Sequence, residues 1–177
     1  DYALGLPLDQ AYAGISATDA TYRESALEFM TPPDPTMHGF VSHGGRIIVF
    51  HGTADPVFSV QDTLQWWQRM QAAYGPAADR SVRLYLVPGM NHSRGGPATD
   101  QMDMFDALVA WVEQGKAPGA IVARARGAGS AVPNPDVPAN WSPTRTRLLC
   151  PYPQVARYAG AGDPEAAASF HCAAPVR

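Results

Sequence analysis

Two short apolar segments on either side of a helix-length segment constrain the fold of this chain most strongly. Residues 47–50, Ile-Ile-Val-Phe, are too short and too β-branched for a helix and predict a buried strand. Residues 82–87, Val-Arg-Leu-Tyr-Leu-Val, predict a second strand. Between them, Ser59 and Asp62 have the spacing of a capped helix start, and Gly75 ends that helix. The pattern predicts a βαβ unit with a right-handed crossover.

The helix after Ser59 has one apolar side, and a second helix is expected further along the chain. Apolar residues recur at helical spacing from residue 100 to residue 114, and Gly115 marks the end. Both helices are expected to turn their apolar sides toward the strands. The expected inward residues are Val60, Leu64, Trp67, Gln71 and Tyr74 in the first helix, and Met102, Phe105, Leu108, Val109 and Val112 in the second.

The segments before and after this α/β pattern differ from it in composition. Residues 1–36 carry a helical pattern at 21–30 and then the breaker Thr-Pro-Pro-Asp-Pro, which favours the end of a lid or cap region. Residues 37–116 hold the α/β pattern and are expected to form the core. Residues 117–177 are rich in Pro, Gly and Ala, which favours a tail packed on that core.

The tail carries weak strand patterns and both cysteines of the chain. Residues 121–126 and 144–148 alternate weakly and predict a hairpin, and Ala166–Ala168 predict a short helix. Cys150 and Cys172 leave one pairing. Two reduced, buried thiols are the alternative, but a segment with little hydrophobic core of its own favours a disulfide. A disulfide in turn predicts a secreted or periplasmic protein.

The charge balance and the hydropathy pattern argue against two kinds of partner. A formal net charge of −3 gives no reason to expect a nucleic acid or an anionic membrane. No apolar segment approaches the roughly 20 residues of a membrane span. The chain opens with Asp1 rather than Met and without a basic-then-apolar signal segment, so we expect that processing or the choice of fragment created this N-terminus.

An acidic residue and a histidine follow the two predicted strands. Asp55 lies in the loop after residues 47–50, and His92 lies in the loop after residues 82–87. Sites in open α/β sheets assemble at the carboxyl ends of the strands. In acyl transfer by a serine enzyme, a histidine moves the proton of the nucleophile and a carboxylate orients the imidazole. Asp55 and His92 are therefore the candidate acid and base, in the chain order typical of such hydrolases.

Each histidine and the acid also have a structural interpretation. An Asp before Pro is a common turn former, and a lone loop histidine is often not catalytic, but their joint placement favours catalysis. His51 ends a buried strand and is expected to be a structural, hydrogen-bonding histidine. His38, His43 and His171 have no convincing acidic partner. No two histidines have the spacing of a zinc site, so we expect no metal and no cofactor in this chain.

No serine of the chain lies in the G-x-S-x-G turn that carries an α/β-hydrolase nucleophile. Residues 14–18, Gly-Ile-Ser-Ala-Thr, come nearest but lack the preceding strand and the second glycine. Residues 42–45, Ser-His-Gly-Gly, look like an oxyanion loop but precede the strand of the acid. Ser93 adjoins the candidate base and is too local to be its partner. We therefore expect the nucleophile upstream of Asp1, in the same polypeptide or in a companion chain.

Five longer motifs carry a resemblance to a known family. They are residues 44–56 (Gly-Gly-Arg-Ile-Ile-Val-Phe-His-Gly through Asp-Pro), 87–92 (Val-Pro-Gly-Met-Asn-His), 111–118 (Trp-Val-Glu-Gln-Gly-Lys-Ala-Pro), 147–153 (Arg-Leu-Leu-Cys-Pro-Tyr-Pro) and 156–164 (Ala-Arg-Tyr-Ala-Gly-Ala-Gly-Asp-Pro). Together they span most of residues 40–172, and in combination they resemble the C-terminal part of the tannase and feruloyl esterase family.

The resemblance implies an α/β-hydrolase fold. This chain would hold the C-terminal portion of the mostly parallel sheet with its flanking helices, plus the end of a lid region. It also implies a secreted or periplasmic protein that hydrolyses carboxylic, often aromatic, esters. Asp55 would be the triad acid and His92 the base.

One position departs from the pattern of this family. Many members carry a cysteine directly after the catalytic histidine, bonded to one directly before the serine, whereas this chain has Ser93. The fine substrate preference of those members is therefore not carried over. A calcium is known in the lid of the family, but its ligands would lie mostly upstream, and this chain shows no such acidic cluster. Some members are cleaved into two associated chains, which would explain a missing serine.

We interpret the chain as the C-terminal portion of a secreted serine carboxylic ester hydrolase. Its substrate would be a small ester with a feruloyl-, galloyl- or terephthaloyl-like group. Trp66, on the flank of the first helix, is expected to pack in the core or on the helix rather than to face lid or substrate. Two alternatives stay open: a non-catalytic hydrolase-like subunit or binding module, and a peptidase of the same fold. A G-x-S-x-G turn upstream of Asp1 would argue against the first.

Overall fold

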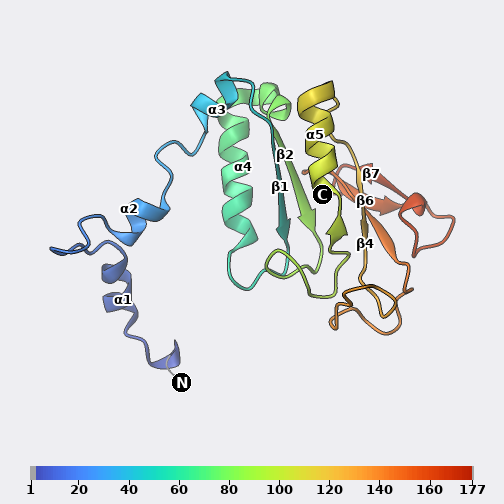
Figure 1. Ribbon diagram of the computed structural model, residues 1–177, viewed down its shortest axis with the longest axis horizontal. Coiled ribbons are helices and arrows are strands. Elements are labelled where there is room, and N and C mark those ends of the chain that lie inside the picture. Colours follow the sequence, from blue (N-terminus) through green and yellow to red (C-terminus); the bar gives the residue numbers. More distant parts are fainter. Residues whose placement is uncertain (1–2, 177) are drawn as a thin grey trace. The chain divides into compact units, whose positions relative to one another are not determined.

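The computed structural model describes residues 3–176 of the chain (Figure 1). The chain divides into two compact units, Asp1–Met37 and His38–Arg177. The predicted lid region ends at residue 36, next to this boundary. The roles predicted for residues 1–36, 37–116 and 117–177 refer to a larger protein and stay predictions.

The first unit consists of short helices. Ser25 caps the last of them in a capping box: its hydroxyl accepts from the backbone N–H of Glu28, whose carboxylate accepts from the N–H of Ser25. The helix predicted from residue 21 begins later, because the carboxylate of Asp19 accepts from the N–H groups of Thr21 and Tyr22 and forms a turn. The helices are η1 (Ala3–Gly5), α1 (Leu8–Ile15), which was not predicted, and α2 (Ala26–Met30).

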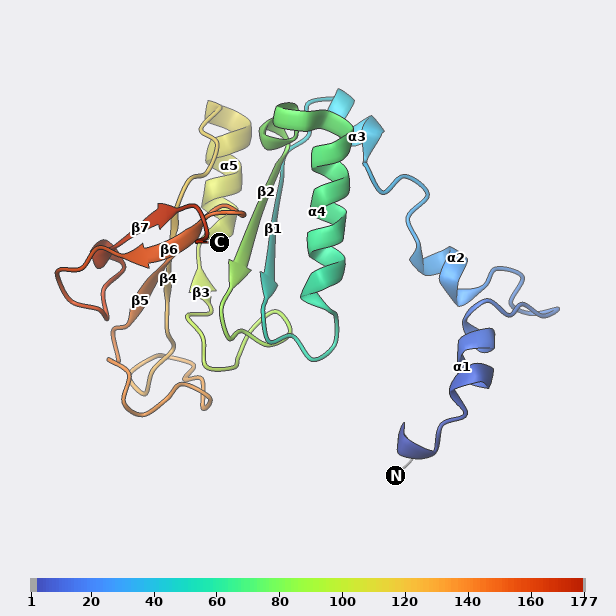
Figure 2. The same cartoon turned by 180° about the vertical axis from the view of Figure 1, so that it is seen from behind.

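A parallel βαβ arrangement organises the second unit, after the short helix α3 (His38–Ser42). Strands β1 (Ile47–Gly52) and β2 (Val82–Val87) pair in parallel along their whole length. Helix α4 (Val60–Tyr74) and the 3-10 helix η2 (Gly75–Arg80) connect them. Both views show the two strands side by side between α4 and α5 (Figures 1 and 2). The predicted strand, helix and second strand are confirmed, and both strands end at the same edge.

Helix α4 begins and ends where the sequence predicts. The hydroxyl of Ser59 accepts from the N–H of Gln61, and Gly75 leaves the helix with a φ of +54° that favours glycine. The five predicted inward residues are all partly buried. Met70, which is fully buried, was not among them.

Helix α5 (Met104–Gln114) corrects the second helix prediction at its start. Asp103 caps it by accepting from the N–H of Asp106, so the helix starts four residues later than residue 100. The preceding residues, β3 (Gln101–Met102), pair with another strand instead. Two of the predicted inward residues are wrong, because Phe105 and Val112 are 74% and 61% exposed. The buried residue of the helix is Trp111, which packs against two guanidinium groups (Arg46 and Arg83).

The remaining strands form two small antiparallel sheets. The predicted hairpin is confirmed by β4 (Ile121–Arg124) and β5 (Thr146–Leu149), which extend β3 into a three-stranded sheet. A second pair, β6 (Val155–Tyr158) and β7 (Phe170–Ala173), was not predicted. The alanine run ends in the 3-10 helix η3 (Ala167–Ser169). Figure 2 shows β3, β4 and β5 on the β2 side of the parallel pair.

The tail shares the hydrophobic core with β2. Tyr85 and Val87 are fully buried with Ala123 and Leu149 from the tail. The backbone N–H of Tyr152 also donates to the carbonyl of Leu84, 2.7 Å away. The predicted disulfide joins the tail to itself between Cys150 and Cys172, with 5.6 Å between their Cα atoms. Within residues 3–176, no helix combines the length and the apolar character that crossing a lipid bilayer requires.

Candidate active site

The loops after β1 and β2 emerge side by side because the two strands are parallel neighbours. Strand β1 ends at Gly52, where the backbone of the second loop comes so close that no side chain fits: a Cβ atom would lie 2.1 Å from the carbonyl oxygen of Met90. The N–H of Ala54 donates to that same carbonyl at 3.1 Å. The sequence therefore places Asp55 and His92 on two loops in direct contact.

Asp55 and His92 meet through a hydrogen bond. Nδ1 of His92 lies 2.9 Å from Oδ2 of Asp55. The other oxygen, Oδ1, accepts from the backbone N–H groups of Val57 and Phe58 at 2.8 and 3.0 Å. The Asp55 side chain is 5% exposed, whereas that of His92 is 46% exposed. The carboxylate is thus enclosed and fixed, and the imidazole is open on its other side.

The contacts of Asp55 favour its ionised form. Burial alone would raise the pKa of this carboxyl, but the hydrogen bonds from His92, Phe58 and Val57 outweigh it and lower the pKa to about 2. A carboxylate only accepts, so Nδ1 of His92 carries the proton of their hydrogen bond. In the neutral imidazole, Nε2 then has a free lone pair, which is the state that a general base requires.

His51 contacts the same carboxylate oxygen as His92, Oδ2 of Asp55. Its Nε2 lies 3.1 Å from the carbonyl oxygen of Phe58 and 3.4 Å from Oδ2 of Asp55, and its Nδ1 lies 2.7 Å from Oγ1 of Thr63. Both neighbours of Nε2 are acceptors, so Nε2 carries the proton and Nδ1 accepts from the threonine hydroxyl. The predicted hydrogen-bonding role of His51 is confirmed. Its proximity to Asp55 was not foreseen.

A buried ion pair supports the loop that carries His92. Arg126 binds Asp100 through two nitrogens, with Nε 3.0 Å from Oδ1 and Nη2 2.6 Å from Oδ2. The Asp100 side chain is fully buried and also accepts from the N–H of Gly95 at 2.8 Å. Burial raises the pKa of Asp100, but Arg126 and Gly95 outweigh it and lower that pKa. The turn is held further by Asn134, which donates to the carbonyl of Gly96.

A small cavity opens beside the pair. Its volume is about 190 Å³. The ring of Phe58 forms one wall, with its centroid 5.3 Å from that of His92. Directly after the imidazole, Ser93 adopts a left-handed φ of +64° that turns the chain away. The lining residues are Phe50, His51, Gly52, Asp55, Phe58, Met90, His92 and Ser93.

The other candidate residues lie apart from this cavity. The ring of His43 contacts the carbonyl oxygen of Gly39 at 2.7 Å. His171 lies on β7, and Trp66 is half-buried on α4. No three His, Cys, Asp or Glu side chains within residues 3–176 are grouped closely enough to hold a metal ion. A lid calcium stays a prediction about sequence outside this chain.

The fold and this site together define an α/β protein with an acid–histidine pair at the carboxyl edge of its parallel strands. The sequence model of the family described as tannase and feruloyl esterase matches residues 6–173. The chain therefore belongs to the tannase and feruloyl esterase family, whose members are carboxylic ester hydrolases.

Curated relatives support this membership. The mono(2-hydroxyethyl) terephthalate hydrolase of Piscinibacter sakaiensis is 44% identical over 169 residues, which cover 91% of this chain and 25% of the relative. A probable feruloyl esterase of Arthroderma benhamiae is 32% identical over 144 residues, covering 79% of this chain and 25% of the relative. The chain thus spans about a quarter of the length of these relatives.

Solved structures confirm the fold. An esterase from Aspergillus oryzae aligns with a TM-score of 0.65 at 23% identity, covering 79% of this chain and 29% of that one. The tannin acyl hydrolase from Aspergillus niger aligns with a TM-score of 0.58 at 21% identity, covering 80% and 25%. These two structural alignments support the predicted α/β-hydrolase type of fold.

Proposed function

We propose that this chain supplies the acid and the base of a serine carboxylic ester hydrolase. The observation that carries the proposal is the 2.9 Å hydrogen bond from Nδ1 of His92 to the enclosed carboxylate of Asp55. It leaves Nε2 of His92 as the proton acceptor on the open side of the ring. The ester hydrolase activity of the family supplies the reaction class.

In this proposal, His92 moves one proton in each half of the reaction. Nε2 takes the proton of the serine hydroxyl as its oxygen bonds to the ester carbonyl carbon, and returns that proton to the departing alcohol. A water molecule then gives a proton to Nε2 as its oxygen bonds to the acyl carbon. Nε2 returns that proton to the serine oxygen as the carboxylic acid is released. Asp55 stays ionised, keeps the imidazole in the required tautomer and stabilises its cation.

The nucleophilic serine is proposed to lie in sequence upstream of this chain. No serine of the chain lies in a G-x-S-x-G turn. The sheet supports the presence of further strands: in residues 3–176 the parallel sheet contains β1 and β2 only, so β1 has an unpaired edge. Phe50 on that strand is 39% exposed. A strand from the upstream portion would pair with this edge and extend the mostly parallel sheet.

The substrate is proposed to be a small aromatic ester. The support comes from relatives named as hydrolases of mono(2-hydroxyethyl) terephthalate and as feruloyl esterases. The exposed aromatic ring of Phe58 beside His92 is compatible with a flat acyl group. The Cys150–Cys172 disulfide supports a secreted or periplasmic location, because such bonds persist in oxidising compartments.

The test compares single and double variants of the full-length protein with an aromatic p-nitrophenyl ester. Asp55→Asn is expected to lower kcat by about 10⁴, because it presents the wrong tautomer, and His92→Ala by a similar or larger factor. The double variant should be little worse than the worse single one, because the pair acts as a unit. His51→Ala should lower stability more than turnover per folded molecule. The assignment would be refuted if the kcat losses of the two single variants multiplied in the double variant. It would also be refuted if His51→Ala lowered kcat more than they do.

A non-catalytic subunit is the rival proposal. It predicts that the purified full-length protein hydrolyses no ester. It also predicts that neither Asp55→Asn nor His92→Ala changes ligand binding. A peptidase of the same fold predicts cleavage of p-nitroanilide peptides in preference to esters. Both can be measured on the same protein preparation.

A further inference from the structure

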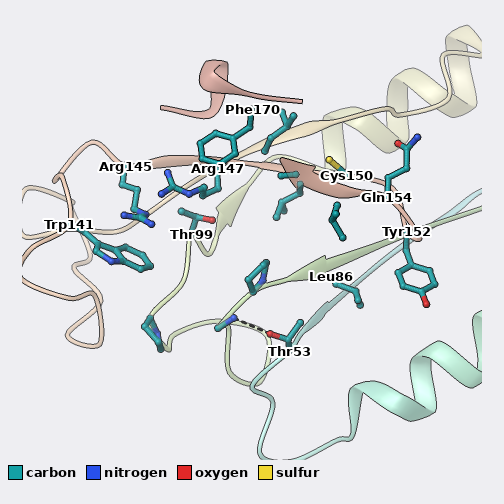
Figure 3. A pocket seen from close by; sticks show the side chains of 17 residues that line it. Thr53, Leu86, Thr99, Trp141, Arg145, Arg147, Cys150, Tyr152, Gln154 and Phe170 are labelled. Atoms are coloured by element: carbon teal, nitrogen blue, oxygen red, sulfur yellow. Dashed lines mark hydrogen bonds between the residues drawn. The ribbon is translucent and has the colours of Figure 1, made fainter. Parts of the chain in front are cut away.

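A second cavity borders the loops after β1 and β2, where Thr53, Pro88 and Gly89 line it. Its volume is about 530 Å³, within the range of small-molecule sites. It is bounded by the end of β2 and by β5, β6 and β7 (Figure 3). It shares no lining residue with the smaller cavity beside His92. The two cavities are therefore separate.

Apolar groups form most of the pocket surface. Leu86 and Pro88 contribute from the end of β2, and Leu148 from β5. Tyr152 lines one end of the pocket, and Trp141 and Phe170 line the other (Figure 3). Flat apolar surfaces of this kind suit a ring or a short chain.

Two arginines stand at the aromatic end. Figure 3 shows Arg145 and Arg147 gathered with Trp141 and Phe170. The guanidinium of Arg145 lies 3.8 Å from the Trp141 ring centroid and pairs with Glu165. That of Arg147 lies 4.9 Å from the Phe170 ring centroid. Both cations are thus held in place by aromatic stacking.

Two carboxylates, Glu165 and Asp163, act on the arginines at this end. Glu165 is the carboxylate that pairs with both arginines, closely with Arg145 and at 3.7 Å with Nη2 of Arg147. Nη1 of Arg147 donates to the carbonyl of Thr146 at 2.8 Å. A guanidinium has five N–H donors, so Arg147 keeps donors for a further partner. Its side chain is 22% exposed, and burial together with the nearby Arg145 charge lowers its pKa despite the opposing charges of Glu165 and Asp163. An additional anion would offset that cost.

We propose that this pocket binds a small carboxylate with a flat apolar body, of which an aryl carboxylate is the simplest example. The carboxylate would accept from the guanidinium of Arg147, and the ring would lie against Phe170 and Pro88. The proposal rests on the pocket alone and stands whether or not Asp55 and His92 are catalytic.

Binding of benzoate to the full-length protein tests the proposal, measured by calorimetry beside the neutral isostere benzamide. Benzoate should bind at least about ten-fold more tightly than benzamide, because a charge-assisted hydrogen bond is lost in the amide. Arg147→Met should weaken benzoate binding by a similar factor and leave benzamide unchanged. Equal affinities for the two probes, or no binding of benzoate, would overturn the proposal.

A second variant covers the case in which Arg147→Met fails to fold. Val155 lines the pocket and is 41% exposed, so Val155→Asp adds a negative charge at its wall with little effect on the core. It should weaken benzoate binding several-fold by like-charge repulsion. Val122→Asp is the matched control, because Val122 is 46% exposed on β4 and does not line the pocket. If benzoate binding is unaffected by Val155→Asp, the ligand binds elsewhere and the proposal is wrong.

Discussion

Oγ1 of Thr53 accepts a hydrogen bond from the backbone N–H of Gly89 at 3.0 Å, and so joins the loop of Asp55 to the loop of His92. Thr53 comes two residues before the acid, and Gly89 three residues before the histidine. Gly89 has a φ of +72°, and a Cβ there would lie 2.5 Å from the carbonyl oxygen of Pro97. This bond and the Asp55–His92 bond therefore both join the two loops.

We expect Thr53→Val to reduce turnover without unfolding the protein. Valine keeps the shape of threonine but cannot accept from Gly89, so the two loops lose one tie. A hydrogen bond of this kind contributes about 0.5–1.5 kcal/mol, which corresponds to roughly two- to ten-fold in kcat if it positions the pair. Thr53→Ser keeps the hydroxyl and is the control. Steady-state kinetics on the full-length protein provide the measurement, and equal kcat values for both variants would contradict the prediction.

The stability of the protein should depend on pH through Asp55. Its pKa is about 2 in the fold and about 4 in an unfolded chain, so its ionised form favours the fold. This contribution is fully present above about pH 4 and is lost as the pH falls toward 2. Urea unfolding of wild type and Asp55→Asn should therefore diverge above pH 4 and converge near pH 2. A constant difference across this window would show that the Asp55 pKa is not lowered.

Arg126→Met should destabilise the protein strongly. It leaves the carboxylate of Asp100 buried without its cation, which typically costs about 3–5 kcal/mol. The double variant Asp100→Asn with Arg126→Met removes that uncompensated charge and should recover part of the loss. Arg80→Met, at an exposed position, is the control for loss of an arginine. Denaturant titration measures all three, and a double variant less stable than Arg126→Met would contradict the explanation.

Loss of the disulfide should lower stability more than activity. Cys150 and Cys172 are 22 residues apart, and in the chain-entropy account such a loop contributes about 3 kcal/mol. Neither cysteine lines the cavity beside His92, so turnover per folded molecule should change little. Thermal unfolding and kinetics of the Cys150→Ser, Cys172→Ser variant test this. Two alkylatable thiols in the untreated protein would disprove the bond itself.

The sequence predicts best what is encoded locally. The β-branched run before His51 and the run ending at Val87 determined two strands, and the spacing from Ser59 to Gly75 determined the helix between them. Their parallel order then placed Asp55 and His92 together. The start of α5 was predicted wrongly because helical spacing alone does not reveal that Asp103 caps the helix.

Contacts between distant residues were not predictable in this way. Arg126 and Asp100 are 26 residues apart, and neither has a local pattern that marks it as a partner. The same holds for His51 and Thr63, although their separation of 12 residues follows from a strand feeding a helix. The pairing of β6 with β7 also joins short segments whose alternation is too weak to predict strands. Asp100 follows the glycine-rich turn at residues 95 and 96, but that turn alone does not reveal that the acid is buried.

The residues that orient His92 all come from one folding unit. Each of the hydrogen bonds described for this site joins two groups within His38–Arg177. The residues concerned are Asp55, Thr53, Asp100, Arg126 and Asn134. In the proposed hydrolase, substitutions outside this unit would change which esters are accepted while Asp55 and His92 keep their geometry. Under this proposal, one acid–base unit could be combined with different upstream sequences to give hydrolases with different acyl preferences.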